Sequence, residues 1–457
     1  MSVSAAGRPP APRPNLLIFH CHDLGQHIGP YGIRTVHTPH LQAFADEGVR
    51  FARSFSPSPS CSPSRAALLT GRYPHTNGVM GLCHANFAWD LHPKERHLAQ
   101  VLKAAGYATS ACGVVHETAS PPKRCGYERH LPNAYAREAV GNAIGELDRL
   151  EAGGKPFFLF VGTIEPHRLP MPASDTWFAG DQGFPGAHLK PDDSLGVQVP
   201  GYLKDTPATR EELAGLQGAV RHVDEQFGRL LAAVRDKGLE ENTLVVFTTD
   251  HGIAMPRAKC SLYEPGLEVA LLLRWPGRQG WSGGRVVREM VCNVDVMPTL
   301  LDALGVPAPP VIQGRSFAPL LDGVPTAPNT AIFGEMTYHD YYDPRRSVRT
   351  ERWKLIANFT TAPAFMDPSQ QWRPRSDVVT PANRATAYHP HLELYDLVAD
   401  PFEQRDLAAD PVHADALAAM CRLLWGHLTA TRDPILRGAV TGPHHRRTLE
   451  RLRAFGA

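Results

Sequence analysis

The chain has 457 residues, 43% of them hydrophobic and 20% charged, and its 47 basic and 46 acidic side chains leave a formal net charge of +1. This length predicts a large domain and a smaller one, and the balanced charge argues against nucleic acid or a membrane surface as partner. Residues 1–14 lack the apolar stretch of a secretory signal, and no run of about 18 apolar residues occurs. We therefore expect a cytoplasmic protein, and a homo-oligomer is compatible with these numbers.

The cysteines and histidines give a first indication of chemistry. The eight cysteines form no CxxC pair, so neither a zinc knuckle nor a disulfide framework is indicated, and we expect most of the thiols to be buried. The 22 histidines are many for this length. In a charge-balanced protein they point to metal or proton chemistry.

Short apolar runs alternate with segments of helical period, which is the pattern of an α/β fold. A sheet covered on both faces needs strands that are apolar or β-branched throughout. A long helix is predicted before the last strand, with Leu213 and Val234 near the two ends of its apolar face and Gly238 as its C-cap. The predicted strands are residues 16–19, 107–111, 157–161 and 244–248.

Polar side chains follow each of these four strands. In open α/β sheets ligands bind at the carboxyl ends of the strands, so side chains from four separate strand ends are expected to meet. One histidine after a strand is more often a loop or core residue, whereas four coincidences favour a shared site. The residues are His20, His22, Asp23, His116, Glu117, Glu165, His167, Asp250 and His251.

The composition of the chain changes beyond about residue 325. Residues 352–357 and 392–396 are predicted strands, and residues 414–428 are a predicted packing helix. We therefore divide the chain into a large α/β domain, residues 1–325, and a small α+β subdomain, residues 326–457.

The stretch from Cys61 to Arg72, Cys-Ser-Pro-Ser-Arg-Ala-Ala-Leu-Leu-Thr-Gly-Arg, is predicted to lead from a loop into a helix, with Pro63 in the first turn. Cys61 then lies at a helix N-terminus, where backbone amides and the helix dipole favour an anion, and Arg65 adds a positive charge one turn later. The Cys-x5-Arg spacing of cysteine-dependent phosphatases would need arginine where Ala67 stands. This segment is predicted to bind an oxyanion.

The same stretch resembles the signature of the sulfatase family, Cys-x-Pro-Ser-Arg followed by x-x-Leu-Leu-Thr-Gly, at every defined position. In that family, part of the alkaline phosphatase superfamily, a formylglycine-generating enzyme oxidises the cysteine to formylglycine (3-oxoalanine). One hydroxyl of the hydrated aldehyde attacks sulfur and the other expels sulfate. The resemblance implies the same modification of Cys61 and an alkaline-phosphatase-like fold, with a mixed, mostly parallel sheet covered by helices.

The resemblance extends over nearly the whole chain, through residues 15–25, 38–41, 242–252, 259–264 and 394–403. Within the family, Pro-Phe-Phe-Leu at residues 156–159 and Phe333-Gly334 are most similar to the N-sulfoglucosamine sulfohydrolase (sulfamidase) group. A sulfuric ester hydrolase is therefore implied, which acts on sulfate esters or N-sulfate groups of a sulfated saccharide.

Matched position by position, the resemblance implies that Asp23, Asp250 and His251 bind one divalent cation together with an oxygen of modified Cys61. The family's usual ion is Ca²⁺, and carboxylates suit such a hard cation. Where most sulfatases have two consecutive aspartates, this chain has His22-Asp23. His22 is therefore a candidate nitrogen ligand, which makes Mn²⁺ an alternative to Ca²⁺.

Arg65 and Lys259 are implied to hold the sulfate group. His116 and His167 are candidates for sulfate binding and for protonating the leaving group, because an imidazole titrates near neutral pH. Where the family usually has a lysine, this chain has Val114, so one contact to sulfate is absent.

The absent lysine leaves alternatives open. Arg124 or Arg168 could supply the missing positive charge. Alternatively, the enzyme accepts a different ester and is a phosphonate monoester or phosphodiester hydrolase of the same superfamily, which also uses formylglycine. A catalytically silent glycan-binding protein is a further alternative, against which the retained Cys61, Arg65 and Asp23 argue.

Residues that select the substrate are expected in loops and in the C-terminal subdomain. Polar side chains there suit sugar hydroxyls, amines or carboxylates. The candidates are His84, Asn86, Glu335, His339 and Arg346.

Overall fold

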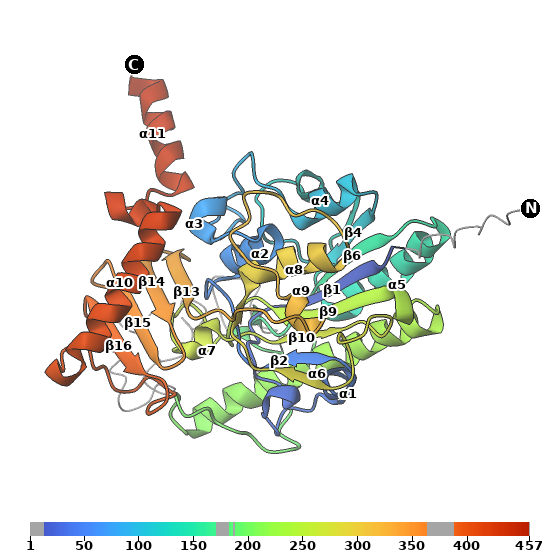
Figure 1. Ribbon diagram of the computed structural model, residues 1–457, viewed down its shortest axis with the longest axis horizontal. Helices are drawn as coiled ribbons and strands as arrows, with labels where there is room; N and C mark the ends of the chain where they lie inside the picture. The colour runs from blue at the N-terminus through green and yellow to red at the C-terminus, as the bar shows by residue number, and fades with distance from the viewer. Residues whose placement is uncertain (1–12, 171–181, 186–187, 363–387, 457) are drawn as a thin grey trace, which may run out of the picture.

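The computed structural model describes residues 13–170, 182–185, 188–362 and 388–456, so most of the N-terminal segment 1–14 lies outside the described residues. A mixed sheet forms its centre, with the strands β1 (Asn15–Cys21), β2 (Val49–Phe51), β4 (Ala108–Gly113), β5 (Arg129–Leu131), β6 (Phe157–Gly162), β9 (Thr243–Thr249), β10 (Leu271–Arg274) and β11 (Arg285–Val287). Their order is β11-β2-β10-β9-β1-β6-β4-β5 (Figure 1). Strands β9, β1, β6, β4 and β5 are parallel, and β10 runs antiparallel to both of its neighbours.

The four predicted strands are β1, β4, β6 and β9, with bounds within two residues of those expected. Every residue of β1, β6 and β9 is buried. This burial on both faces explains why these segments are continuous apolar runs instead of alternating ones. The predicted α/β class and mostly parallel sheet are confirmed.

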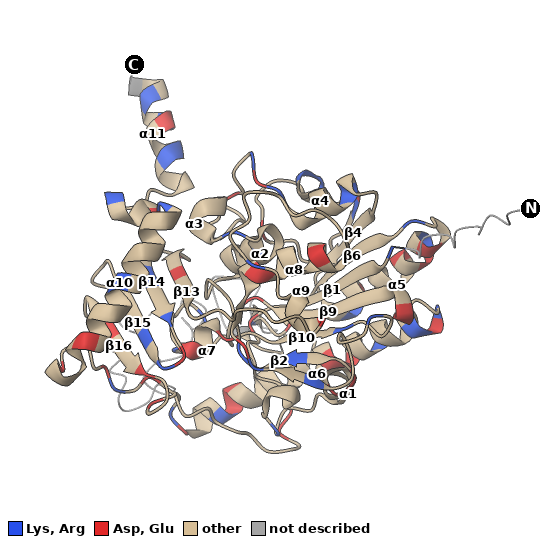
Figure 2. Cartoon of the chain, viewed as in Figure 1, with Lys and Arg blue, Asp and Glu red and all other residues tan. Residues whose placement is uncertain are grey.

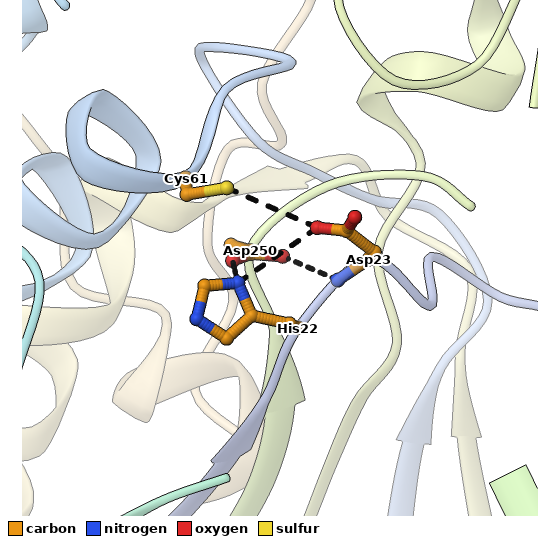
Figure 3. A group of neighbouring side chains, drawn as sticks. All are labelled: His22, Asp23, Cys61 and Asp250. Carbon is orange, nitrogen blue, oxygen red and sulfur yellow. Dashed lines mark hydrogen bonds and ion pairs between the residues drawn. The ribbon is translucent and has the colours of Figure 1, made fainter. Parts of the chain in front are cut away.

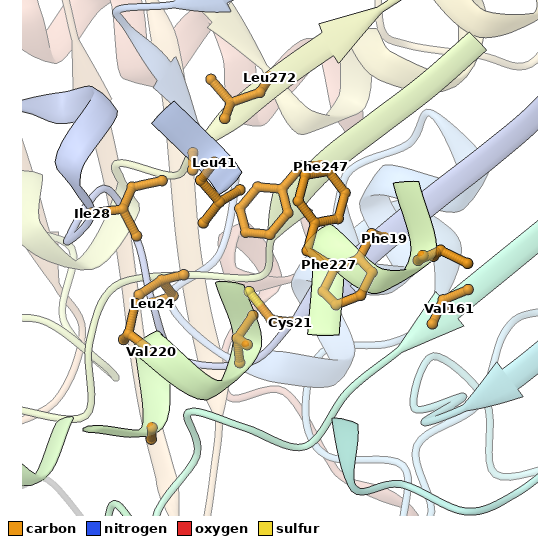
Figure 4. Packing of buried hydrophobic residues seen from close by; sticks show 14 of the residues in the cluster. Phe19, Cys21, Leu24, Ile28, Leu41, Val161, Val220, Phe227, Phe247 and Leu272 are labelled. Atoms are coloured by element: carbon orange, nitrogen blue, oxygen red, sulfur yellow. The ribbon is translucent and has the colours of Figure 1, made fainter. Parts of the chain in front are cut away.

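Helices cover both faces of the sheet (Figure 1). In the core on one face, Phe19 of β1 contacts Phe227 and Phe247, with ring centroids 5.2 and 5.7 Å away (Figure 4). This face is covered by α1 (Pro39–Glu47), α5 (Ala136–Ala152) and α6 (Pro207–Asp236), and the other by α2 (Cys61–Thr70), α4 (Leu98–Ala104), α8 (Val296–Ala303) and α9 (Ala318–Leu321).

The long predicted helix is α6, and the residues of its apolar face from Leu213 to Val234 are buried. The expectation that Gly238 is its C-cap is wrong, because Lys237 occupies that position. Gly238 follows the C-cap with φ of 66°, the left-handed conformation by which the chain leaves the helix.

The C-terminal part contains an antiparallel sheet in the order β13-β14-β15-β16. Its strands are β13 (Ile332–Tyr338), β14 (Tyr342–Arg349), β15 (Trp353–Asn358) and β16 (Leu392–Asp396), and α10 (Ala414–Thr431) packs on it. The two predicted strands and the predicted helix correspond to β15, β16 and α10. The sequence did not predict β13 and β14. In β14 the charged residues Asp343, Arg345, Arg346 and Arg349 hide the pattern of a strand. The division at residue 325 stays a prediction.

Shorter elements complete the chain. They are the strand pairs β3 (Ser54–Phe55) with β12 (Val291–Cys292) and β7 (Leu169–Pro170) with β8 (Gln182–Gly183), and the helices α3 (Pro74–Asn77), α7 (Glu264–Leu267) and α11 (Pro443–Gly456). Helix α11 extends away from the rest of the structure (Figure 1).

Lys and Arg positions and Asp and Glu positions are interspersed along the elements (Figure 2), in agreement with the formal net charge of +1. Among the described residues, we find no helix with both the length and the apolar character to cross a membrane.

Candidate active site

The ends of β1 and β9 bring two carboxylates together, because these parallel strands are neighbours in the sheet. Asp23 follows β1 and Asp250 follows β9, and the backbone N–H of Asp23 donates a hydrogen bond to Asp250 Oδ1 at 2.9 Å. Asp23 has φ of 45°, a left-handed conformation in which an aspartate is tolerated. Both carboxylates are completely buried (Figure 3).

Cys61 is the first residue of α2 and faces these carboxylates (Figure 3). Its Sγ lies 3.8 Å from Asp23 Oδ1 and 3.3 Å from His251 Nε2. Burial raises the pKa of the Cys61 thiol well above its usual value, and the lysine at position 259 opposes this only in part. An unmodified Cys61 is therefore a neutral thiol, which is a poor nucleophile.

The first turn of α2 fixes Asp250 from two positions. Arg65 is fully buried, and its Nε lies 3.3 Å from Asp250 Oδ2. Ser64 Oγ donates a hydrogen bond to the Asp250 carbonyl at 2.5 Å. Ser64 was not among the site residues predicted from the sequence, although its spacing of three residues from Cys61 places both on one face of the helix.

Lys259 connects Asp23 to a histidine from another strand end. Its Nζ lies 2.7 Å from Asp23 Oδ2 and 3.0 Å from Nε2 of His167, a residue that follows β6. Burial alone would lower the pKa of Lys259, but Asp23 raises it above its ordinary value, so the ammonium stays charged. His167 Nδ1 lies 2.7 Å from the carbonyl of Arg168, which can only accept, so Nδ1 carries the hydrogen.

The residues around Asp23 and Asp250 keep both carboxylates ionised. Burial would raise the pKa of Asp23, but His167, Lys259 and His251 together lower it well below its usual range. For Asp250, burial is likewise outweighed by His251, His22 and Arg65. The centre therefore holds two buried anions.

The donor atoms around these anions fit a divalent cation. His251 Nδ1 lies 2.9 Å from the Gly252 carbonyl and must carry the hydrogen, which leaves the lone pair of Nε2 3.3 Å from Asp23 Oδ1. His22 Nδ1 lies 3.0 Å from Asp250 Oδ2. One donor atom from each of His22, Asp23, Cys61 and Asp250 lies within 4.8 Å of the others, with all four residues buried. Residues of these types in this arrangement are those that bind metal ions in proteins.

A second pair of histidines lies beside this centre. His116 Nε2 and His84 Nδ1 are 2.8 Å apart, and the rings of His116 and His22 have centroids 5.9 Å apart. His84 is exposed, so the pair leads from the buried centre to solvent. Glu117 fixes the backbone at His116, because its Oε2 accepts a hydrogen bond from the backbone N–H of His116 at 2.8 Å.

Two of the strand-end residues have their main contacts elsewhere in the fold. The Glu165 carboxylate accepts a hydrogen bond from the backbone N–H of Ala136 at the start of α5 and pairs with His188 at 3.0 Å. His20 is completely buried, with its ring centroid 5.9 Å from that of Phe160. The expectation of a place in the shared site is therefore wrong for the Glu165 side chain, whereas His20 is buried within electrostatic reach of Arg65 and Asp250.

The C-terminal candidates divide into two groups. Glu335 accepts hydrogen bonds from the backbone and ring of His75, and Arg346 forms an ion pair with Asp433. Both side chains are buried, at 4% and 1% exposed. His339 lies near His84, whose pKa it lowers together with burial. Binding of substrate by these residues stays a prediction, as it does for the exposed Asn86.

The two arginines considered as replacements for the absent lysine are engaged in ion pairs. Arg168 pairs with Glu212, and Arg124 lies 2.9 Å from Asp90. Both cations therefore already have a carboxylate partner.

Known proteins resemble this chain over almost all of its length. The family model "Sulfatase" matches residues 14–306, and the model "N-sulphoglucosamine sulphohydrolase, C-terminal" matches residues 256–370. The chain belongs to the sulfatase family. The human N-sulphoglucosamine sulphohydrolase is 31% identical to this sulfatase over 92% of the chain and 91% of its own length.

Solved structures share the fold of this sulfatase. One, described as a complex with its substrate D-glucosamine-2-N,6-O-disulfate, has a TM-score of 0.69 at 21% identity and covers 92% of this chain and 98% of its own. The phosphonate monoester hydrolase of Agrobacterium radiobacter has a TM-score of 0.66 at 22% identity, with 92% and 96% covered. The alkaline-phosphatase-like fold and the class of sulfuric ester hydrolases implied by the sequence are confirmed, whereas likeness at this level does not separate the two activities.

Proposed function

We propose that this sulfatase hydrolyses a sulfate ester or an N-sulfate group of a sulfated saccharide, with formylglycine at position 61 and a divalent cation. The observation that carries the proposal is the contact of Cys61 with Asp23 and His251 at the N-terminus of α2. An oxyanion at this point would meet the helix dipole, the Arg65 guanidinium and the Lys259 ammonium.

Oxidation of Cys61 is supported by the state of its thiol. A thiol whose pKa is raised by burial is protonated at neutral pH and does not attack sulfur. A formylglycine-generating enzyme is therefore the partner that we expect during maturation. The hydrated aldehyde would supply a hydroxyl nucleophile, and the cation would lower the pKa of that hydroxyl and neutralise oxygen charge on the sulfate.

The side chains of the protein hold the sulfate and move protons. Arg65 and Lys259 are buried cations whose positions are fixed by Asp250 and Asp23, so they can hold a sulfate group without reorganising. His167 and His116 border the centre and are the candidates for giving a proton to the departing oxygen or nitrogen. Burial lowers the pKa of both imidazoles, so each would first have to take up a proton.

The substrate class rests on the comparisons. The family model that matches residues 256–370 is that of N-sulphoglucosamine sulphohydrolase, and the human enzyme of this name is 31% identical over 92% of the chain. A glucosamine carrying an N-sulfate group is therefore the first compound to test.

A phosphonate monoester is the second candidate, favoured by Val114. This position has no charge, and Arg124 and Arg168 are held by carboxylates, so the charge expected for sulfate binding is lower than in sulfatases with a lysine there.

Assays on a single preparation of the protein can distinguish the candidate functions. Peptide mass spectrometry would establish the aldehyde at position 61, and the aldehyde-bearing, metal-loaded protein would then be assayed with N-sulfoglucosamine, an aryl sulfate and a phosphonate monoester. We expect the highest kcat/KM for a sulfated compound. A higher value for the phosphonate would reverse the ranking, and inertness toward all three would favour a glycan-binding protein without catalysis.

A further inference from the structure

We infer that the cation site of this protein selects a first-row transition-metal dication such as Mn²⁺ over Ca²⁺, because His22 replaces an oxygen donor with an imidazole nitrogen. This inference rests on the proposed metal site and goes beyond it by naming the class of ion. It depends on the position of one side chain.

His22 is aimed between the two buried carboxylates (Figure 3). Its Nδ1 lies 3.0 Å from Asp250 Oδ2 and 3.8 Å from Asp23 Oδ1. The residue is 1% exposed, and neither of its ring nitrogens has a hydrogen-bond partner within the described residues. Burying an imidazole without satisfying it costs free energy, so ordinary packing does not explain why a polar ring stands here. A cation bound at Nδ1 does explain it.

The resulting set of donors is mixed. His22 Nδ1, carboxylate oxygens of Asp23 and Asp250, and the side chain at position 61 form one group of donors. His251 Nε2 would add a second nitrogen, since it lies 3.3 Å from Asp23 Oδ1 and 3.3 Å from Cys61 Sγ. His251 Nδ1 is held by the Gly252 carbonyl, so its Nε2 is oriented as a ligand independently of His22. Adjacent donors around a cation at about 2.1 Å lie roughly 3.0 Å apart, and the spacing of 3.0 to 3.8 Å between these donor atoms is compatible with one ion.

The chemistry of these donors decides the class of ion. Ca²⁺ takes six to eight oxygen ligands and gains little from a neutral nitrogen. First-row dications bind imidazole well, and Mn²⁺ in addition accepts carboxylates. The site has two carboxylate side chains, Asp23 and Asp250, where a third would favour Ca²⁺. Both the nitrogen count and the charge therefore disfavour Ca²⁺.

Metal binding can be measured without turnover. Metal-free full-length protein would be titrated with Mn²⁺ and with Ca²⁺ by calorimetry, and a 1:1 mixture of both ions would be equilibrated with it and the bound ions counted by mass spectrometry. We expect at least tenfold tighter binding of Mn²⁺. Pulsed electron paramagnetic resonance of the Mn²⁺-loaded protein should show two coupled imidazole nitrogens.

The variant that tests the assignment is His22→Asp. It should reduce the preference for Mn²⁺ by at least tenfold and leave one coupled nitrogen, that of His251. His22→Asn, which offers a neutral oxygen, separates the effect of ligand type from that of charge and should also leave one nitrogen. The matched control is His444→Asp on the exposed α11, which makes the same change of charge and should leave the binding of both ions unchanged.

Two results would overturn the inference: equal or tighter binding of Ca²⁺ by the unaltered protein, or a single coupled nitrogen in it. The spectroscopic count decides the matter even where His22→Asp does not fold. If the protein hydrolyses sulfate with Ca²⁺ and does not bind Mn²⁺ more tightly, the inferred metal selectivity is wrong and the proposed function stands. If the aldehyde-bearing protein binds Mn²⁺ selectively but hydrolyses no sulfated compound, the inferred metal selectivity stands and the proposed function is wrong.

Discussion

Lys259 and Asp23 form an ion pair at the centre of the site, with Nζ and Oδ2 2.7 Å apart and both residues at most 2% exposed. The two residues are 236 positions apart in the sequence. Each keeps the other ionised, because the ammonium lowers the pKa of the carboxyl and the carboxylate raises that of the ammonium.

Lys259→Met should lower kcat/KM for a sulfated substrate by about 10²- to 10³-fold, since it removes one fixed cation facing the sulfate. It should also lower the melting temperature of the metal-free protein, because Asp23 loses its nearest cation. Steady-state kinetics and thermal unfolding measure the two effects. Lys103→Met, which removes an exposed ion pair with Glu128, is the control and should change neither. Unaltered kinetics of Lys259→Met would exclude Lys259 from sulfate binding.

Cys61→Ala should abolish turnover, by at least about 10³-fold in kcat, while the protein keeps its fold, because a small buried side chain is lost together with the nucleophile. Aldehyde labelling of the unaltered protein and its absence from the variant identify the modified position. Cys421→Ala, on α10 and partly exposed, is the matched control. Sulfate hydrolysis that persists in Cys61→Ala would remove the basis of the proposed function.

Arg346→Leu should lower the free energy of unfolding by about 3–5 kcal/mol, because Asp433 would be left buried without its guanidinium partner. Urea denaturation measures this loss. Arg352→Leu removes the exposed partner of Asp396, whose carboxylate keeps the hydrogen bonds from the backbone N–H groups of Val398 and Ala399, and should leave the urea midpoint nearly unchanged. If Arg346→Leu instead raised KM without loss of stability, the role in substrate binding predicted from the sequence would be correct.

Acid should destabilise the fold through His27. Burial lowers the pKa of this imidazole from 6.5 to about 4, so between these values the unfolded chain binds a proton that the folded protein does not. Stability therefore falls as the pH decreases from 6.5 toward 4, by about 1.4 kcal/mol per pH unit from this residue.

The variant His27→Gln should flatten the decline of the melting temperature over this pH range. His445→Gln on the exposed face of α11 should leave the decline as it is. A slope unchanged in His27→Gln would mean that the folded protein protonates this imidazole with its ordinary pKa.

Local patterns were sufficient for part of this molecule. The apolar runs predicted β1, β4, β6 and β9 because a strand buried on both faces must be apolar at every position. The spacing within Cys61–Arg72 predicted a helix N-terminus beside a fixed cation. Both are properties of neighbouring residues and can be read without knowing the fold.

The same patterns failed where burial is decided by distant partners. Glu165 and His20 follow or end strands as Asp23 does, but Glu165 fixes the start of α5 and His20 lies in the core. Strands β13 and β14 were missed because their charged side chains are paired inside the fold with residues such as Asp433.

The sequence alone determined the α/β class, the sulfatase signature and the residue types available for chemistry. Only the tertiary structure decided which of them share one centre, because residues such as Asp23 and Asp250, 227 positions apart, meet through the order of parallel strands in the sheet. The tertiary structure also determines that His22 Nδ1 lies between the Asp23 and Asp250 carboxylates. Strand order and side-chain direction follow from packing of the whole chain, which no local pattern contains.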